Sequence, residues 1–299
     1  MSRSFCLVLL FLGLSLGSGA ARAGAADVAV VASIRPLALI ARAVGGDRVQ
    51  VRQLVPNGTS SHDYQLRPSD RVSLSGTDIV LWAGPAHEQF LRKTLGSGRA
   101  LLITAQSLPG IRLHAQRSLE GSAVLPGTVD PHLWLDADNA VVIAVALADA
   151  LVRRDPAHAA LYRRNAAAFA ARMTAFKSRN AERFKALPAR AVVAYHDAYQ
   201  YLEPALGLRF RGSLTIHDAG RTGARHFLLM SQRIQDEGIS CLLAEPGFDE
   251  ALARRAFAGR VASFTSVDEF FVAVPFDGKG YEAGLTQMAD AIYHCLGGH

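Results

Sequence analysis

The stretch AHAALYRRNAAAFAARMTAFKSRNAERFKAL, residues 157–187, decides the expected fold. It contains no Gly and no Pro and is rich in Ala and Arg, which favour helices. At 1.5 Å per residue it predicts a rod about 45 Å long. Asp155-Pro156 precedes the stretch and Pro188 ends it, because Pro lacks the N–H that a helix interior needs. A single helix of this length is expected to join two separate parts of the chain.

On both sides of this helix, short apolar runs alternate with helical segments. Strands are expected at 28–34, 49–55, 79–82 and 101–104, and again at 191–194, 213–216, 241–244 and 261–265. Helices are expected at 37–44, 69–74, 86–95 and 137–154, and again at 199–206, 224–237, 249–258 and 281–296, with an irregular loop at 107–131. This alternation predicts parallel sheets covered by helices on both faces. We therefore expect an α/β protein with two doubly wound lobes, 24–156 and 188–299, joined by one long rigid backbone helix at 157–187.

The first 23 residues have the features of a cleavable signal peptide. Arg3 supplies a positive charge, Leu7–Leu16 forms an apolar core, and Ala21-Arg22-Ala23 offers the small-x-small pattern that signal peptidase cuts. The apolar run is too short to span a bilayer, which needs about 20 such residues. A retained N-terminal anchor is the alternative. We expect the mature chain to begin near Gly24 and to be secreted.

The composition is typical of a globular protein and argues against a nucleic-acid partner. Apolar residues make up 50% of the chain and charged residues 19%. The formal net charge of +6 falls to +4 once Arg3 and Arg22 leave with the signal peptide. The other basic residues are scattered over expected helices, so we interpret them as solvated faces. No second long apolar run follows, which predicts a soluble protein, and no GxxxxGK[ST] motif suggests ATP binding.

Two cysteines remain after processing, Cys241 and Cys295. In an oxidising compartment an isolated pair is more often a disulfide than a metal site. Closing a loop of 54 residues would stabilise the fold by about 4 kcal/mol in the chain-entropy model. Two free thiols remain the alternative, because the sequence gives no distance in space.

Three of the ten histidines lie at the boundary of an expected element. His62 follows the second strand, His132 ends the irregular loop, and His196 follows the strand at 191–194. Doubly wound folds bind ligands beyond the carboxyl ends of their strands. We therefore expect these imidazoles to meet around one metal ion in the cleft between the lobes. The remaining histidines are interpreted as ordinary side chains: His87, His114, His158, His217, His226, His294 and His299.

A series of motifs in a fixed order gives the chain a family resemblance. They are Val31-Ala32-Ser33-Ile34-Arg35-Pro36-Leu37, Pro56-Asn57-Gly58-Thr59-Ser60-Ser61-His62-Asp63-Tyr64, Arg67-Pro68-Ser69-Asp70, Asp130-Pro131-His132-Leu133-Trp134-Leu135, His196-Asp197-Ala198-Tyr199 and Ala244-Glu245-Pro246. Together they resemble the cluster A-I metal-binding solute-binding proteins of bacterial ABC importers, and within them the zinc-specific ZnuA type. The resemblance covers essentially the whole mature chain.

The resemblance implies a metal site in the cleft, with His62, His132 and His196 as ligands. Asp268, or else a water, takes the fourth position, although Ser266-Val267-Asp268-Glu269 departs from the family's usual pattern there. It also implies a monomeric periplasmic receptor, not an enzyme, that captures Zn²⁺ and delivers it to an ABC-type permease with its ATPase subunit.

Two further comparisons with the family point in opposite directions. Zinc-type members often carry a His- and acid-rich loop between the first two ligands, whereas residues 112–130 hold only His114. Cys241 and Cys295 lie where zinc-type members have a disulfide, so the resemblance also implies that bond.

The residue types suit zinc better than the alternatives. Three imidazoles and one oxygen match four-coordinate Zn²⁺, whereas manganese-type relatives place a carboxylate where His196 stands. Acid is expected to release the metal, because an imidazole must be neutral to bind it. Asp63 and Asp197 are candidates to orient imidazoles. The alternatives are a manganese or iron importer subunit, a zinc hydrolase with Glu245 as general base, or a surface adhesin.

Overall fold

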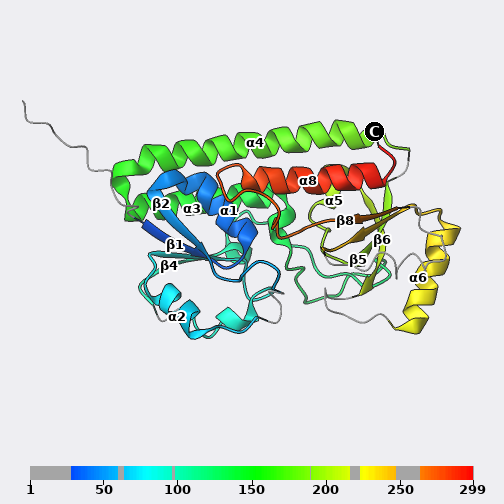
Figure 1. Cartoon of the computed structure of the whole chain (residues 1–299), viewed down its shortest axis with the longest axis horizontal. Coiled ribbons are helices and arrows are strands. Elements are labelled where there is room, and N and C mark those ends of the chain that lie inside the picture. Colours follow the sequence, from blue (N-terminus) through cyan, green and yellow to red (C-terminus); the bar gives the residue numbers. More distant parts are fainter. Residues whose placement is uncertain are drawn as a thin grey trace, which may run out of the picture.

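The computed structural model describes residues 28–59, 64–95, 98–188, 190–215, 223–246 and 263–298. It contains two four-stranded sheets with a long helix running along both of them (Figure 1). Every strand pairing within the two sheets is parallel. The predicted fold, two α/β lobes joined by a long helix, is confirmed.

The first sheet consists of β1 (Val28–Ala32), β2 (Val49–Gln53), β3 (Ile79–Trp82) and β4 (Leu101–Thr104), in the order β2-β1-β3-β4. Alternate side chains of β1 and β3 point to opposite faces, and both faces are buried. Val30 and Leu81 pack toward α1 (Arg35–Gly45) and α3 (Ala137–Arg154). Val31 and Val80 pack with Leu74 of α2 (Pro68–Ser75) on the other face. A strand buried on both faces reads as a continuous apolar run, which is why these strands stand out in the sequence.

The second sheet repeats this order, with β6-β5-β7-β8. Its strands are β5 (Ala191–His196), β6 (Arg209–Thr215), β7 (Cys241–Ala244) and β8 (Ser263–Ser266). Helix α6 (Ala224–Asp236) covers one face with Met230 and Ile234. Helix α8 (Gly280–Cys295) lies against β7 and β8. The disulfide between Cys241 and Cys295 is present, with sulfur atoms 2.07 Å apart, and it ties the start of β7 to the end of α8.

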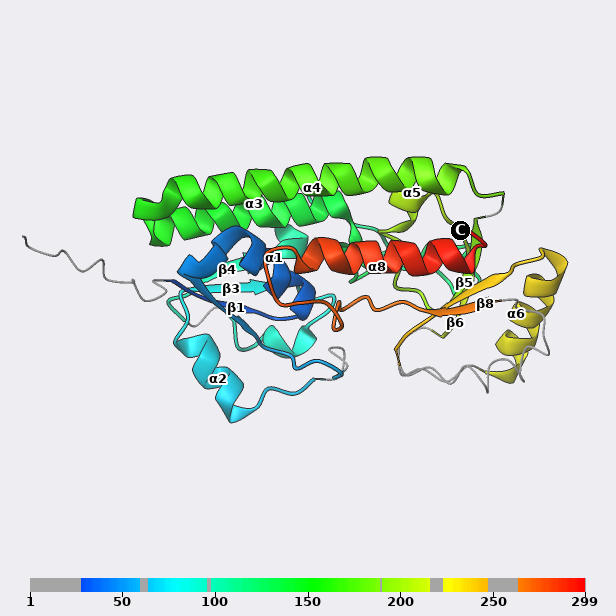
Figure 2. The ribbon, with the colours of Figure 1, turned by 45° about the horizontal axis from the view of Figure 1, so that its top comes forward.

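Helix α4 (Ala159–Lys185) spans both lobes and buries one stripe of large side chains, among them Tyr162, Phe169, Phe176 and Phe184. It packs on α1 and α3 of the first lobe and on α5 (Glu203–Leu206) of the second. Helix α8 lies beside α4 in both views and also contacts α1 (Figures 1 and 2). One continuous apolar cluster therefore runs through both lobes, and two helices rather than one hold them together.

Two predicted helices are much shorter than expected. Within 86–95 only Gln89–Leu91 forms a 3₁₀ turn, because the Glu88 carboxylate accepts hydrogen bonds from the backbone N–H groups of Ala83 and Gly84. Within 199–206 only Glu203–Leu206 is helical, because Pro204 is tolerated in a first turn but not in a helix interior. The predicted helix 249–258 and the signal peptide 1–23 lie outside the described residues.

The loop at 107–131 is irregular, as predicted, apart from one antiparallel bridge between Arg117 and Val124. Among the described residues, no helix is both long and apolar enough to cross a membrane.

Candidate metal centre

The carboxyl ends of the strands of the second sheet bring three potential ligands together. His196 is the last residue of β5, Glu245 directly follows β7, and Glu269 lies in the segment after β8. One ligand atom from each of the three lies within 4.8 Å of the other two. The strand-end rule therefore holds for this lobe, and it places two carboxylates beside the predicted histidine.

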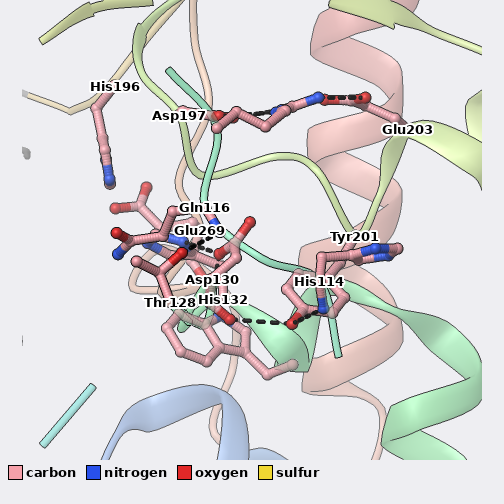
Figure 3. A network of polar contacts seen from close by, with 12 residues as sticks. His114, Gln116, Thr128, Asp130, His132, His196, Asp197, Tyr201, Glu203 and Glu269 are labelled. Atoms are coloured by element: carbon pink, nitrogen blue, oxygen red, sulfur yellow. Dashed lines mark hydrogen bonds and ion pairs between the residues drawn. The ribbon is translucent and has the colours of Figure 1, made fainter. Parts of the chain in front are cut away.

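The structure brings two of the predicted ligands, His132 and His196, close together (Figure 3). Their side chains are 2% and 3% exposed, and their ring centroids are 5.0 Å apart at an interplanar angle of 65°. With Zn–N bonds of about 2.1 Å, two imidazoles at a tetrahedral angle around one zinc ion have centroids about 5 Å apart. The two rings are thus at the separation that a shared zinc ion requires.

A carboxylate holds each of these imidazoles by its Nδ1 atom; that of Asp130 is buried and that of Glu245 is partly buried. Asp130 Oδ1 lies 2.8 Å from Nδ1 of His132, and Glu245 Oε1 lies 2.8 Å from Nδ1 of His196. When Nδ1 donates its proton to the carboxylate, Nε2 carries the lone pair that a metal needs. Burial raises the pKa of Asp130 to about 6. Both rings are therefore oriented as in carboxylate–histidine–metal arrangements.

The partners of the imidazoles differ from those that the sequence suggested. Both carboxylate oxygens of Asp197 accept hydrogen bonds from Arg117, so Asp197 does not take the predicted role beside an imidazole. Asp63 lies outside the described residues. Glu245, the candidate general base of the hydrolase alternative, instead holds the His196 ring. Of the two carboxylate partners, only Asp130 is close to its histidine in the sequence. It stands two residues before His132, with Pro131 between them.

Asp268 and Glu269 are neighbours with different surroundings. The Asp268 carboxylate accepts hydrogen bonds from the backbone N–H groups of Phe270, Val272 and Ala273, at 3.0, 2.5 and 3.4 Å. Glu269 is 4% exposed and belongs to the group with His196 and Glu245, which does not include Asp268. The predicted fourth ligand thus stabilises its own loop, and the next residue faces the histidine.

His62 lies outside the described residues, with its neighbours 60–63. The preceding residue in the structure, Thr59, lines a cavity of about 180 Å³ together with Glu245 and Glu269. The chain therefore leaves the described part of the first lobe at the edge of the same cleft.

One buried histidine of the site escaped the sequence-based selection. His87 is 3% exposed, and its ring centroid lies 6.3 Å from that of His132 and 4.8 Å from that of Trp134. Nothing in Gly84-Pro85-Ala86-His87 signals this position, because only the fold brings it beside the cleft. His114 packs on Tyr201, with ring centroids 4.6 Å apart, rather than on the two site histidines.

The site geometry agrees with comparisons against known proteins. A family model described as zinc-uptake complex component A, periplasmic, matches residues 30–295. The chain belongs to this family. Among its relatives, the high-affinity zinc uptake system protein ZnuA of Brucella abortus is 27% identical and covers 89% of this chain and 91% of the relative. The protein of the same name from Yersinia pestis is also 27% identical, with coverages of 91% and 92%.

Solved structures of other proteins share the fold of this chain. The laminin-binding protein Lmb of Streptococcus agalactiae, described as having adhesin and metal transporting activity, has a TM-score of 0.78 at 21% identity, with coverages of 90% and 99%. A crystal structure of ZnuA has a TM-score of 0.73 at 21% identity, with coverages of 89% and 99%. The Pseudomonas aeruginosa protein FpvC, in complex with Mn²⁺, has a TM-score of 0.75 at 21% identity, with coverages of 91% and 98%. The predicted membership of the cluster A-I, ZnuA-type proteins is confirmed.

Proposed function

We propose that this chain is the periplasmic zinc-binding component of an ABC importer, which captures Zn²⁺ in the cleft and delivers it to a membrane permease with its ATPase subunit. The pair His132 and His196 carries this proposal. Their ring centroids are 5.0 Å apart, and each ring is held at Nδ1 by a carboxylate. The family to which the chain belongs is named for zinc uptake in the periplasm.

The proposed ligands are His62, His132, His196 and Glu269. Three imidazoles and one carboxylate oxygen give the four-coordinate shell that zinc favours. Glu269 replaces Asp268 in this proposal because it is buried in the group with His196, whereas the Asp268 carboxylate is occupied by backbone amides. His62 follows the second strand in the sequence and lies outside the described residues.

Delivery is proposed to involve small movements rather than a wide opening of the lobes. Helices α4 and α8 both contact elements of the two lobes, and the apolar cluster is continuous between them. Such a scaffold permits limited relative motion, so metal release depends on withdrawing a ligand from one side of the cleft. The chain is proposed to act as a monomer and not as an enzyme, since Glu245, its candidate base, holds an imidazole.

A manganese or iron importer subunit is the second candidate. The specific observation in its favour is the pair of carboxylates, Glu245 and Glu269, close to His196, because carboxylates suit harder ions. A structural neighbour was solved in complex with Mn²⁺. Imidazole-rich sites nevertheless prefer zinc to manganese by affinity order.

Competition between the two metals tests the proposal. The mature protein is stripped with a chelator, equilibrated with equal buffered activities of Zn²⁺ and Mn²⁺, and analysed for bound metal. Retention of one zinc ion per chain is expected, and preferential retention of manganese would overturn the zinc assignment. A His294→Ala chain is the matched control, because His294 lies on the exposed side of α8 and its loss leaves zinc binding unchanged.

A further inference from the structure

The segment that carries His132 is fastened to the second lobe, although the sheet that precedes it belongs to the first. Arg117 reaches across and makes four hydrogen bonds, two to Asp197 at 2.9 and 2.5 Å and two to Glu203 at 3.0 and 2.7 Å. The guanidinium also lies 3.9 Å above the centroid of the Phe210 ring on β6. All three charged side chains are mostly buried, with exposures of 10%, 14% and 15%.

Three more hydrogen bonds join the same segment to the second lobe. The backbone carbonyl of Leu119 accepts a hydrogen bond from the N–H of Ser213 on β6, at 2.8 Å. The Tyr201 hydroxyl accepts a hydrogen bond from the N–H of His114 and donates one to the carbonyl of Asp130, each at 3.0 Å (Figure 3). The chain is thus fixed on both sides of Arg117 before it reaches His132.

These contacts connect the two histidines through one short path. Asp197, which accepts two hydrogen bonds from Arg117, is the residue after His196. Asp130, which Tyr201 holds, binds the His132 ring through Nδ1. Contacts of residues 114–132 with the second lobe therefore contribute to the position of His132 relative to His196.

We propose that Arg117 is a positioning residue for the zinc site, which sets His132 against His196 before the metal arrives. This inference rests on the proposed function and deepens it. It makes His132, His196 and Glu269 a preformed part of the proposed site. A site that is preformed in part binds more tightly because less order has to be created when the ion binds.

The direction of the change in zinc affinity distinguishes a positioning role of Arg117 from a purely electrostatic one. Arg117 is a positive charge near the site, so its removal alone would increase the attraction of the cleft for a cation. Positioning predicts the opposite, since partners that orient ligands are worth about 10- to 100-fold in metal affinity. Arg117→Gln is therefore expected to weaken zinc binding about tenfold and to speed zinc dissociation by a similar factor.

The test compares wild type, Arg117→Gln, Arg117→Lys and a control, Arg211→Gln. Arg211 lies on β6, as Phe210 does, and makes two hydrogen bonds to one carboxylate, Glu237, at 2.5 and 2.8 Å. Zinc affinity and dissociation are measured by chelator competition, and the visible spectrum of bound Co²⁺ reports the geometry of the ligands. The free energy of unfolding of each metal-free chain is measured separately.

Weaker zinc binding and an altered Co²⁺ spectrum are expected for Arg117→Gln, smaller changes of the same sign for Arg117→Lys, and neither change for Arg211→Gln. If Arg117→Gln does not fold, Arg117→Lys decides, because it keeps the charge without the four hydrogen bonds. Unchanged or tighter zinc binding with an unaltered spectrum would overturn the positioning role while leaving the proposed function intact. A wild-type chain that binds no zinc overturns both.

Discussion

Replacing Glu269 by glutamine is expected to weaken zinc binding strongly. The side chain is 4% exposed and belongs to the group with His196 and Glu245. Removing one partner of a buried charge pair costs about 3–5 kcal/mol. The glutamine carbonyl oxygen is still able to reach the ion, so we take the lower end, about 3 kcal/mol, which corresponds to roughly a 100-fold loss of affinity.

Asp268→Asn provides a matched comparison at the adjacent position. The Asp268 carboxylate accepts three backbone hydrogen bonds within its own loop, at 3.0, 2.5 and 3.4 Å. Asparagine has one acceptor oxygen fewer, so the free energy of unfolding is expected to fall by about 2 kcal/mol. Zinc affinity is expected to change less than for Glu269→Gln, because the loop is disturbed but the ligands remain.

Two assays separate these effects. Competition with a chromophoric zinc chelator gives the affinity of each variant, and urea denaturation of the metal-free chain gives its stability. Glu269→Gln is expected to lose affinity and to keep its stability, and Asp268→Asn is expected to do the reverse. If Asp268→Asn weakens zinc binding more than Glu269→Gln, the fourth ligand is Asp268 and the reasoning from burial is wrong.

Three further perturbations test the fold around the site. Replacing both Cys241 and Cys295 by alanine opens a loop of 54 residues and is expected to lower the free energy of unfolding by about 4 kcal/mol. Urea denaturation measures this change. A loss below about 1 kcal/mol contradicts the prediction. Burial raises the pKa of Glu88 from 4.5 to about 7, so in this range the folded state holds a proton that the unfolded state has lost. Stability therefore falls as the pH rises from about 5 to 7, and Glu88→Gln is expected to remove that part of the slope in denaturation curves taken across this range; an unchanged slope argues against a raised pKa. Trp134→Phe removes the 2.9 Å hydrogen bond from Nε1 to the carbonyl of Glu269. This substitution is expected to weaken zinc binding severalfold in the chelator assay. An unaffected zinc affinity would show that this hydrogen bond does not hold the loop that carries Glu269.

Local patterns were sufficient for most elements of the fold. The predicted strands 79–82, 101–104 and 241–244 and the predicted helix 137–154 coincide with β3, β4, β7 and α3. Each is a continuous apolar or Ala- and Val-rich run with clear boundaries, so local preference and tertiary burial agree. The shortened helices at 86–95 and 199–206 differ because a buried carboxylate and a proline override the local pattern.

The candidate site was only partly predictable. The boundary positions of His132 and His196 marked them in the sequence, and the structure brings their rings together. Glu245 binds His196 from 49 residues away, and its contact depends on how β5 and β7 pair. The hydrogen bond between Trp134 and the carbonyl of Glu269 spans 135 residues. Such contacts depend on how strands pair and on how segments far apart in the sequence pack, which no local pattern encodes.

The most direct test of the shared site is the zinc-edge X-ray absorption spectrum of the mature protein loaded with one equivalent of zinc. Imidazoles from both sides of the cleft on one ion predict three nitrogen ligands with the multiple scattering of histidine rings, at about 2.0–2.1 Å, and one oxygen. The His132→Ala and His196→Ala chains should each show one imidazole fewer. A wild-type spectrum with a single imidazole, or one that neither substitution changes, would contradict the convergence of these histidines on one metal.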